Sequence, residues 1–325
     1  ILGNHYFEDL KALVLCAMFF NDEPVLHTAL KAFKAECKEE ILPDGMHFEL
    51  SPMYHKLIFE GVVRVVVALK DKGLDDCEVN GYLQPMLDVA WSLEEGLDRI
   101  PLFNDVGNNV AKSLQALVSA CKEHFGITPE YKSRFIDSGF YIFKQNDWKL
   151  IVDAGQPGPA YIPGHAHCDA MSFELFKTGK PVIVNCGTYA YQCKERSFFR
   201  STAAHNTVMV NDTEQSQCWG AFRMAKRSKV NVVSVSEKSI VIELMDQRGQ
   251  TVKRTIQLEK TLKVTDESGG NKLTAFVHPI NDIDMTFDGN SETIGQQYAP
   301  EYGELVSLEA VRYEGNGKIS VEICI

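Results

Sequence analysis

The apolar positions of this 325-residue chain change their spacing partway along the sequence. Up to about residue 135 they recur every three or four residues, which is the spacing of one face of a helix. This pattern predicts helices near residues 5–20, 23–41, 53–72, 83–100 and 108–126. Short turn-rich sequences such as NDEP, LPDG and DKG separate these segments, so neighbouring helices are expected to run antiparallel.

Beyond residue 135 the apolar residues alternate with polar ones in short runs such as WKLIVDA, NTVMVND, SIVIELM and VKRTIQL. Many short strands of this kind predict an antiparallel sandwich of stacked sheets. We therefore expect an α+β protein of two domains, with helices in residues 1–135 and a β-sandwich in residues 136–325. The halves are expected to pack directly, since no low-complexity linker separates them. A cleft between two domains is a favoured place for a ligand.

Composition narrows the range of partners. The net charge of −11 argues against nucleic-acid binding through a general basic field. No apolar run approaches the ~20 residues needed to cross a bilayer, so membrane insertion is not expected.

Nine cysteines without CxxC spacing are expected to be reduced and mostly buried. The sequence starts inside an amphipathic helical pattern without an initiator Met, so we expect the natural protein to extend upstream.

The sequence PGHAHCDAMSFEL, residues 163–175, contains the most unusual polar pattern. Read as a strand, it places His165, His167 and Asp169 on one face. Three such side chains are costly to bury without partners. Downstream, His205 and Asn206 interrupt another apolar strand. The pattern fits either a metal or catalytic site or a set of hydrogen-bonded structural histidines.

Two polar groups mark the starts of predicted helices. Asn4, His5 and Glu8 lie at the first, where a solvated helix start is the plainer interpretation. Ser51 is a natural N-cap and is followed by a proline, which places Tyr54 in the first turn of the third helix. The helix dipole there favours the ionised phenol, as a proton-exchanging tyrosine requires. A core tyrosine is the alternative.

Five sequence blocks together resemble a known family. They are NHYFEDLKAL, LPDGMHFELSPMYHKLIFE, DSGFYIF, PGHAHCDAMSFELFKTGKPVIVNCGTYAY and FRSTAAHNTVMVND with the following QS and WGAFR. In this order they resemble the heparinase II/III-like polysaccharide lyases, including the related alginate lyases. The resemblance implies an incomplete α/α toroid followed by a multilayer antiparallel β-sandwich, with further toroid helices upstream. It also implies a periplasmic or secreted protein, although the nine cysteines leave a cytoplasmic location open.

The resemblance implies β-elimination at a uronic acid within an acidic polysaccharide, with catalytic roles for five residues. Asn4 and His5 would engage the uronate carboxylate, and His5 is also a candidate base. Tyr54 would be the general acid, or acid and base together. His165 would line the cleft from the sandwich side. Tyr191, or its neighbour Tyr189, matches a tyrosine that some members use in elimination.

The resemblance also implies residues that contact substrate and a structural metal. The substrate-contacting residues would be Glu8, Tyr189, Arg196 and Arg200. His167 and His205 would bind zinc, and Asn185, in VNCGTY, replaces the aspartate that supplies a third ligand in zinc-containing members. Because a neutral amide is a poor zinc ligand, this replacement leaves the metal open. Asp169 would either substitute or orient a histidine.

A second function remains open from the sequence. A non-catalytic carbohydrate-binding or polysaccharide-assembly protein on the same scaffold would fit the acidic charge and Asn185. Metal-dependent hydrolysis is disfavoured, because no water-activating carboxylate accompanies the histidines at a known spacing. The sequence specifies neither the polysaccharide nor the oligomeric state.

Overall fold

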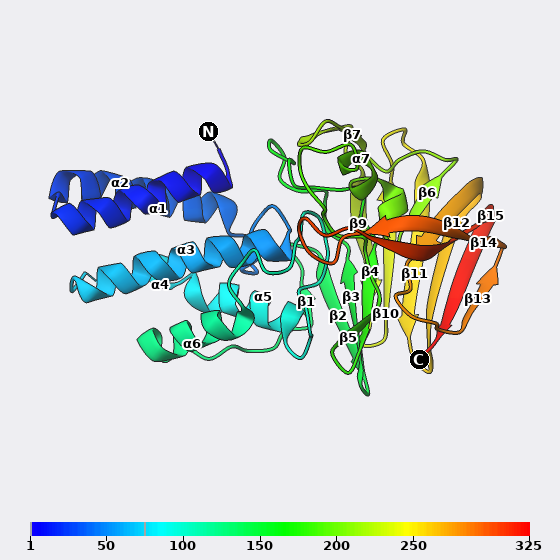
Figure 1. Ribbon diagram of the computed structural model, residues 1–325, viewed down its shortest axis with the longest axis horizontal. Helices are drawn as coiled ribbons and strands as arrows, with labels where there is room; N and C mark the ends of the chain where they lie inside the picture. The colour runs from blue at the N-terminus through cyan, green and yellow to red at the C-terminus, as the bar shows by residue number, and fades with distance from the viewer. Residues whose placement is uncertain (1, 75) are drawn as a thin grey trace.

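The computed structural model describes residues 2–74 and 76–325 and has helices at one side and β-sheets at the other (Figure 1). The helices of the first part are α1 (Asn4–Phe20), α2 (Glu23–Glu40), α3 (Pro52–Asp71), α4 (Cys77–Asn80), α5 (Leu83–Glu94) and α6 (Leu114–Phe125). The predicted helices are confirmed, but the last two are shorter than expected. Residues 95–113 between them are largely irregular and carry part of the candidate site described below.

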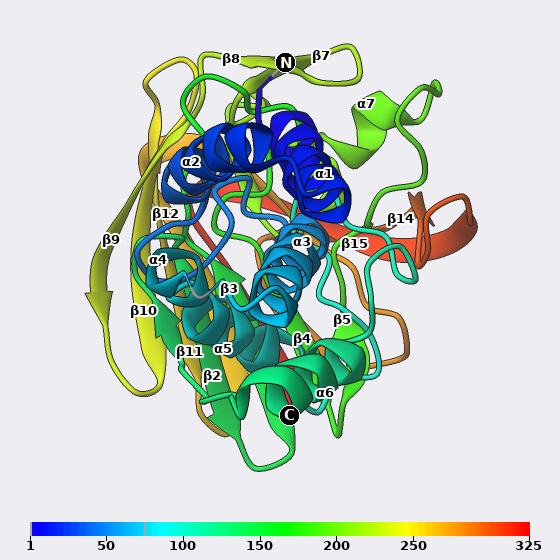
Figure 2. The same cartoon turned by 90° about the vertical axis from the view of Figure 1, so that its left-hand side faces the viewer.

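Local sequence signals explain where the helices begin. The Ser51 hydroxyl accepts a hydrogen bond from the backbone N–H of Tyr54 at 3.2 Å, as an N-cap does. Asp22 caps α2 in the same way, by accepting from Val25. Helices α1 and α3 lie side by side, and both begin at the end that faces the sheets (Figures 1 and 2). Their first turns can therefore contribute side chains to the boundary between the two parts.

The second part contains two stacked sheets. The smaller has the order β1 (Arg134–Phe135), β2 (Phe140–Gln145), β3 (Trp148–Asp153), β4 (Phe173–Lys177) and β5 (Lys180–Ile183). The larger has the order β13 (Met285–Asp288), β15 (Val306–Cys324), β12 (Thr261–Val277), β11 (Thr251–Leu258), β10 (Ser239–Met245) and β9 (Lys229–Val235). Strand β14 (Asn290–Tyr298) pairs with β15, and β6 (Val208–Val210) pairs with β12. The strands pair antiparallel throughout, as predicted.

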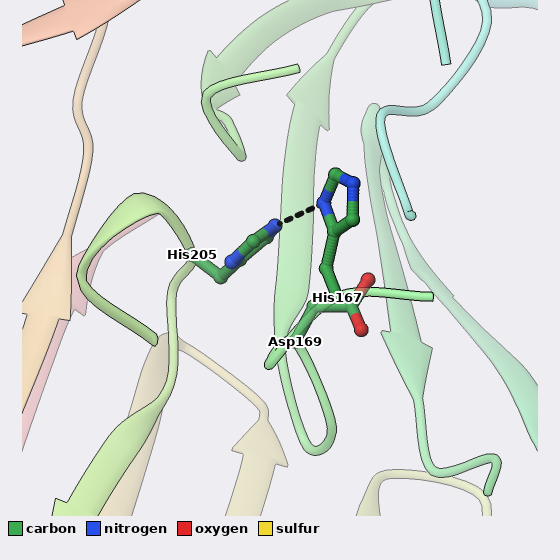
Figure 3. Close-up of side chains that lie close together, drawn as sticks. All are labelled: His167, Asp169 and His205. Carbon is green, nitrogen blue, oxygen red and sulfur yellow. Dashed lines mark hydrogen bonds between the residues drawn. The ribbon is translucent and has the colours of Figure 1, made fainter. Parts of the chain in front are cut away.

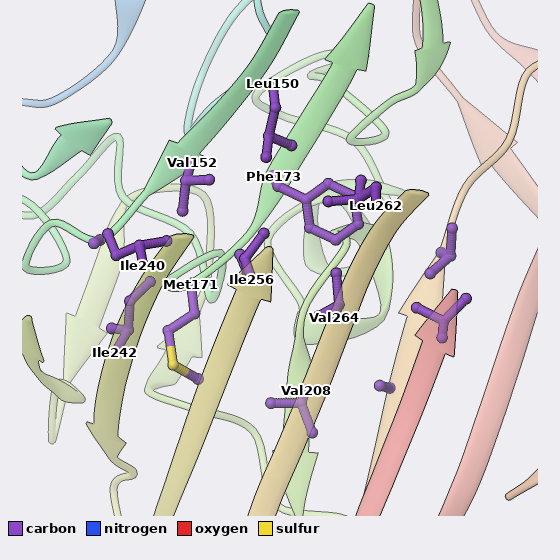
Figure 4. Packing of buried hydrophobic residues seen from close by; sticks show 14 of the residues in the cluster. Leu150, Val152, Met171, Phe173, Val208, Ile240, Ile242, Ile256, Leu262 and Val264 are labelled. Atoms are coloured by element: carbon purple, nitrogen blue, oxygen red, sulfur yellow. The ribbon is translucent and has the colours of Figure 1, made fainter. Parts of the chain in front are cut away.

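The smaller sheet is buried on both faces, which explains why its strands are apolar at nearly every position. Leu150, Val152 and Phe173 point into the core shared with the larger sheet (Figure 4). Phe140 and Ile151 point the other way, into a cluster with residues of the helical part. The sheet thus forms the middle layer, and the helices pack directly on the sandwich.

Polar residues gather in the long loops at the edge of the sandwich. One loop, residues 154–172, precedes β4; another, residues 184–207, contains the short helices α7 (Arg196–Phe199) and η1 (Thr202–Ala204). The predicted strand through residues 163–175 is wrong for most of its length, since β4 begins only at Phe173. A separate hairpin follows, formed by β7 (Gln217–Trp219) and β8 (Arg223–Ala225).

The helical part has exposed apolar side chains but no membrane-spanning helix among the described residues. Part of the apolar surface of α1 is exposed, at Leu13, Phe19 and Phe20. Among the described residues, the helices are too short or too polar to span a bilayer.

Candidate active site

Asp105, in the irregular segment after α5, lies at the centre of the polar cluster at the domain boundary. Its carboxylate is fully buried and forms a two-point ion pair with the guanidinium of Arg196, whose Nη2 lies 2.7 Å from Oδ2. His165 Nδ1 and His167 Nε2 each lie 2.9 Å from one of its oxygens. The Thr188 hydroxyl donates to Oδ1 at 3.1 Å. Four side chains from two loops of the sandwich therefore converge on one carboxylate.

These contacts determine the charge of Asp105 and the tautomers of its partners. Burial alone would raise the pKa of Asp105, but Arg196, His167 and His165 together hold that pKa well below its usual range. Because an ionised carboxylate only accepts, the histidine nitrogens that face it carry hydrogen. Arg196 Nη1 also lies 3.3 Å from His167 Nε2, but both nitrogens donate to Asp105.

Tyr54, His165 and Tyr191 come together beside this carboxylate, as predicted for one cleft. The hydroxyl groups of Tyr54 and Tyr191 are 2.9 Å apart, and the rings of Tyr54 and His165 lie 4.0 Å apart between centroids. Phe222 and Tyr302 extend the aromatic surface outward from Tyr191, at 5.2 and 5.4 Å between ring centroids. Both of these outer rings are exposed, so the aromatic cluster opens to solvent.

Both phenols of this pair are neutral at physiological pH. Burial is the main reason that the pKa of Tyr54 and the pKa of Tyr191 are raised, and the negative charge of Asp105 adds to the effect. The pKa of Tyr54 is therefore raised although the residue lies in the first turn of α3, because desolvation is the largest contribution. Both hydroxyl groups therefore carry a proton.

His167 and His205 form a second pair (Figure 3). His167 Nδ1 and His205 Nε2 lie 3.2 Å apart, and both side chains are buried. The other nitrogen of His167 donates to Asp105, and His205 Nδ1 donates to the Ser201 carbonyl at 2.8 Å. The two facing nitrogens therefore both present lone pairs when the rings are neutral. Burial lowers the pKa of His167 to about 4 and also lowers that of His205.

Facing lone pairs fit a shared cation. Two ligands of a tetrahedral zinc, each at about 2.0–2.1 Å, lie about 3.3 Å apart. One carboxylate oxygen of Asp169 is a third potential ligand atom, within 4.8 Å of the two histidine nitrogens. Asn185 lies elsewhere, since its amide oxygen accepts from the Asn206 backbone N–H at 3.0 Å and its Nδ2 lies 3.3 Å from the Ser172 hydroxyl. The donor set fits a metal through Asp169 better than through Asn185.

The residues expected to contact substrate separate into buried and peripheral ones. Arg196 is buried, and its charge is paired with Asp105. Arg200 is also buried and donates to the carbonyls of Ala166, Gly220, Ala221 and Arg223. The expectation that Arg200 contacts the sugar is therefore wrong, because its donors are used within the protein. Tyr189 packs against a different cluster, with Cys186 and Phe199.

Asn4, His5 and Glu8 lie on the first two turns of α1. Asn4 and Glu8 line a groove with Leu57, one turn beyond Tyr54 on α3. His5 is exposed, and Glu8 forms an ion pair with Lys11. Within residues 2–74 and 76–325, neither Asn4 nor His5 makes a hydrogen bond to the Tyr54–Tyr191 pair. The structure therefore brings the α1 residues near α3 without joining them to the central cluster.

A second buried acid cluster lies beside the start of α1. It contains Glu40, at the end of α2, with His47 and Glu49 in the following loop, and His47 Nε2 is 3.2 Å from a Glu40 oxygen. Glu40 Oε1, His47 Nδ1 and Glu49 Oε2 are buried without a hydrogen-bond partner among the described atoms. A Cβ at Gly3 would come within 3.6–3.8 Å of both carboxylates and clash with Ile162. The cluster therefore underlies the segment that leads to Asn4.

Asp105 is the main functional candidate that the sequence analysis missed. The segment FNDVGNN reads as a loop, and its donors lie 60–91 residues away along the chain. Asn104 has a left-handed backbone (φ 59°) and accepts from the backbone N–H of His167. The adjacent Asn104 and Asp105 inside an otherwise apolar segment are the feature of the sequence that could have indicated a buried polar site.

Two family models match this chain, one in each half. The heparinase II/III-like C-terminal family model matches residues 127–313, and the heparinase II/III N-terminus model matches residues 2–132. The chain belongs to the heparinase II/III-like family. The predicted resemblance and fold class are thereby confirmed.

The relatives are lyases that are longer than this chain. A heparin-sulfate lyase from Pedobacter heparinus is 25% identical over 243 residues, covering 65% of this chain and 36% of that protein. One from Bacteroides stercoris is 24% identical over 258 residues, covering 66% and 36%. A heparinase III crystal structure superposes with a TM-score of 0.81 at 15% identity, covering 99% of this chain and 61% of that one. The matched segment thus spans about a third of the length of these curated relatives.

Proposed function

We propose that the protein acts as a polysaccharide lyase that cleaves a uronic-acid-containing chain by β-elimination. The observation that carries the proposal is the Tyr54–Tyr191 hydroxyl pair held against His165 at an aromatic surface open to solvent. Membership in a family with heparin-sulfate lyases supports the reaction class. An acidic polysaccharide is the proposed substrate.

Elimination needs a base to remove the C5 proton of the uronate. His165 is a suitable candidate, because Asp105 accepts from its Nδ1 and so fixes the tautomer whose Nε2 carries a lone pair. Tyr54 is the alternative base once its proton has passed to solvent, and the Tyr191 hydroxyl can then donate a hydrogen bond to the Tyr54 phenolate. In either case Asp105 acts through His165 and does not itself need to touch the sugar.

Elimination also needs an acid for the departing glycosidic oxygen. A neutral Tyr54 or Tyr191 meets this need, since each hydroxyl carries a proton that it can give to the departing oxygen. Their mutual hydrogen bond lets one hydroxyl replace the proton that the other gives up. We assign the acid to this pair, with Tyr54 as the donor to the substrate.

The C5 proton is acidic enough to leave only if the neighbouring carboxylate is neutralised or hydrogen-bonded. Asn4 and His5 are proposed for this role from the first turn of α1, which begins at the sandwich side beside α3 (Figure 1). The exposed rings of Phe222 and Tyr302 provide apolar surface for the faces of neighbouring sugar rings.

We further propose that His167 and His205 hold a structural zinc ion. A bound zinc supplies positive charge between the two lone pairs and joins the loop before β4 to the η1 turn. Elemental analysis of protein purified without chelator is expected to give near-stoichiometric zinc, and His205→Ala is expected to lose it. Metal-free protein of unchanged stability would contradict this assignment.

The lyase proposal is tested by incubating the full-length protein with a panel of uronate polysaccharides and following the absorbance of the unsaturated product. Tyr54→Phe keeps the ring and is expected to lower turnover by ~10²–10⁴-fold, the usual contribution of one acid–base group. Tyr82→Phe, at a tyrosine packed against the helical core, is the matched control and should retain activity. Binding of a polysaccharide without unsaturated product would instead favour the carbohydrate-binding alternative.

A further inference from the structure

Two cysteine sulfurs touch next to the histidine cluster. Cys168 follows His167 in the chain and is buried, whereas Cys218 lies in β7 and is partly exposed. Their Sγ atoms are 3.7 Å apart, although the residues are 50 positions apart in sequence. The Cys168 thiol also lies 3.3 Å from the carbonyl of Ser216. This contact lies between the loop that carries His165 and His167 and the β7–β8 hairpin.

The β7–β8 hairpin forms one wall of the candidate active site. Phe222, in its turn, packs against His165 and Tyr191 at 5.8 and 5.2 Å between ring centroids. The carbonyl of Ala221 accepts from Arg196 Nε at 3.0 Å. The hairpin is a two-stranded sheet that is not continued by either large sheet. Because an isolated two-stranded hairpin is only marginally stable, its position depends on such side contacts.

We propose that Cys168 and Cys218 form a reversible disulfide that anchors this hairpin to the histidine-bearing loop. A disulfide bond is about 2.05 Å long, so the sulfurs need to approach by less than 2 Å. Cys218, the more accessible thiol, starts the exchange. The inference rests on the sulfur contact and does not depend on lyase activity.

The chemistry is thiol–disulfide exchange with a small-molecule disulfide as oxidant. The Cys218 thiolate attacks one sulfur of the reagent, which forms a mixed disulfide and releases one reagent thiol. The Cys168 sulfur then attacks the Cys218 sulfur and expels the second reagent thiol. Two electrons pass from the protein thiols to the reagent, and their two protons end on the two reagent thiols.

The cross-link has two expected physical effects. It closes a loop of about 50 residues, which removes conformational freedom from the unfolded chain and is expected to raise Tm by about 3–6 °C. It also joins the hairpin covalently to the loop, so backbone amides of residues 217–225 should exchange more slowly in the oxidised protein. A thiol pair that only packs would give neither effect on oxidation.

The test treats the full-length protein with oxidised glutathione or with dithiothreitol and maps its peptides by mass spectrometry. The expected result is a peptide linked through Cys168 and Cys218, about 2 Da lighter than the sum of the reduced peptides. Oxidation should raise the Tm of the wild type and of Cys193→Ala, a matched variant at another partly buried cysteine beside the hairpin. It should leave the Tm of Cys218→Ala unchanged.

Three results would overturn the proposal. They are a cross-link through Cys193 in place of Cys168, no intramolecular cross-link at any oxidant concentration, and a Tm increase that persists in Cys218→Ala. Because Cys168 is buried, Cys168→Ser is a supporting variant only, and the decisive variant is at the more exposed Cys218. The lyase assay is separate, so its failure would leave this test intact.

Discussion

Two buried clusters of acids and histidines lie near the domain boundary, and they differ in how many donors they receive. Asp105 receives a guanidinium, two ring N–H groups and a hydroxyl. Glu40 and Glu49 share a single histidine, and three polar atoms of that cluster lack partners among the described atoms. The two clusters contain similar residue types, but Asp105 receives more hydrogen-bond donors than Glu40 and Glu49 do.

The pKa values respond in opposite directions. Burial raises the pKa of Glu40 to about 7, while the Asp105 partners overcome burial and hold the Asp105 pKa well below its usual range. Burial also lowers the pKa of His47 to about 4, so this ring stays neutral and does not offset its neighbours' charge. The comparison shows that hydrogen-bond donors, and not burial alone, decide whether a buried acid is charged.

The largest expected effect comes from removing the charge of Asp105. Asp105→Asn leaves the buried guanidinium of Arg196 without its counter-ion and places an amide among N–H donors. Breaking one side of a buried ion pair costs about 3–5 kcal/mol, so urea unfolding should show a loss of that size. Turnover per folded molecule should also fall, because His165 loses the partner that fixes its tautomer.

Asp266→Asn is the matched control for that variant. Asp266 makes a similarly buried two-point ion pair with Arg254, at 2.7 and 2.8 Å, inside the large sheet. Its loss should destabilise the protein by a similar amount and leave turnover per folded molecule unchanged. Equal loss of turnover in both variants would mean that Asp105 matters only for stability.

Replacing Glu40 is expected to change stability by less than replacing Asp105 does, and to stabilise the protein instead of destabilising it. Its folded pKa of about 7 exceeds the ordinary value of 4.5, so the folded state binds more protons than the unfolded state between these pH values. Stability therefore falls as pH rises through this window, and the penalty is fully present above pH 7. Glu40→Gln should remove it and stabilise the protein at pH 8 by about 1–3 kcal/mol.

The measurement at Glu40 is thermal or urea unfolding at pH 5 and pH 8. The stability gap between the two pH values should shrink in Glu40→Gln. Glu123→Gln, on the exposed side of α6, should leave the gap as in the wild type. A Glu40→Gln variant that is less stable than the wild type at pH 8 would contradict a raised pKa.

The smallest effect is expected at Thr188, which gives Asp105 one of its four donors. Thr188→Val keeps the shape and removes the hydroxyl, at an expected cost of about 1–2 kcal/mol. Because a depressed carboxylate pKa contributes stability above about pH 3.8 and loses it in acid, the difference from wild type should narrow as pH falls toward the folded pKa. Thr261→Val, which removes a hydroxyl bond to the part-buried Glu322, should cost less. A larger loss of stability in Thr261→Val than in Thr188→Val would contradict the expectation that the hydroxyl bond to Asp105 is the more important of the two.

Periodicity predicted the fold class well, because the helical and alternating patterns are long and each element buries a face that its own residues specify. It failed at residues 95–100 and 108–113, where helices were expected, and at residues 163–172, where a strand was expected. In these segments the backbone is shaped by tertiary contacts, such as the hydrogen bond of the Asn104 backbone N–H to Asp169 at 2.7 Å. Local sequence does not encode partners that lie 65 residues away.

The candidate site was predictable only where single residues carried a family motif. Tyr54, His165 and Tyr191 were expected in one cleft, and the structure brings them together. Asp105 was missed because its importance lies in the donors that reach it. Arg200 was misassigned because the sequence does not reveal whether a guanidinium ends at the surface or among buried carbonyls.

The position of Asp105 has a consequence for how the chain matures. It sits in the segment that leaves the last helices, yet Arg196, His165 and His167 all belong to loops of the sandwich. Neither half alone contains the complete set of charges. A nascent chain can therefore acquire the arrangement only after the sandwich has been synthesised and the two halves have docked, so assembly of the site reports that folding has finished.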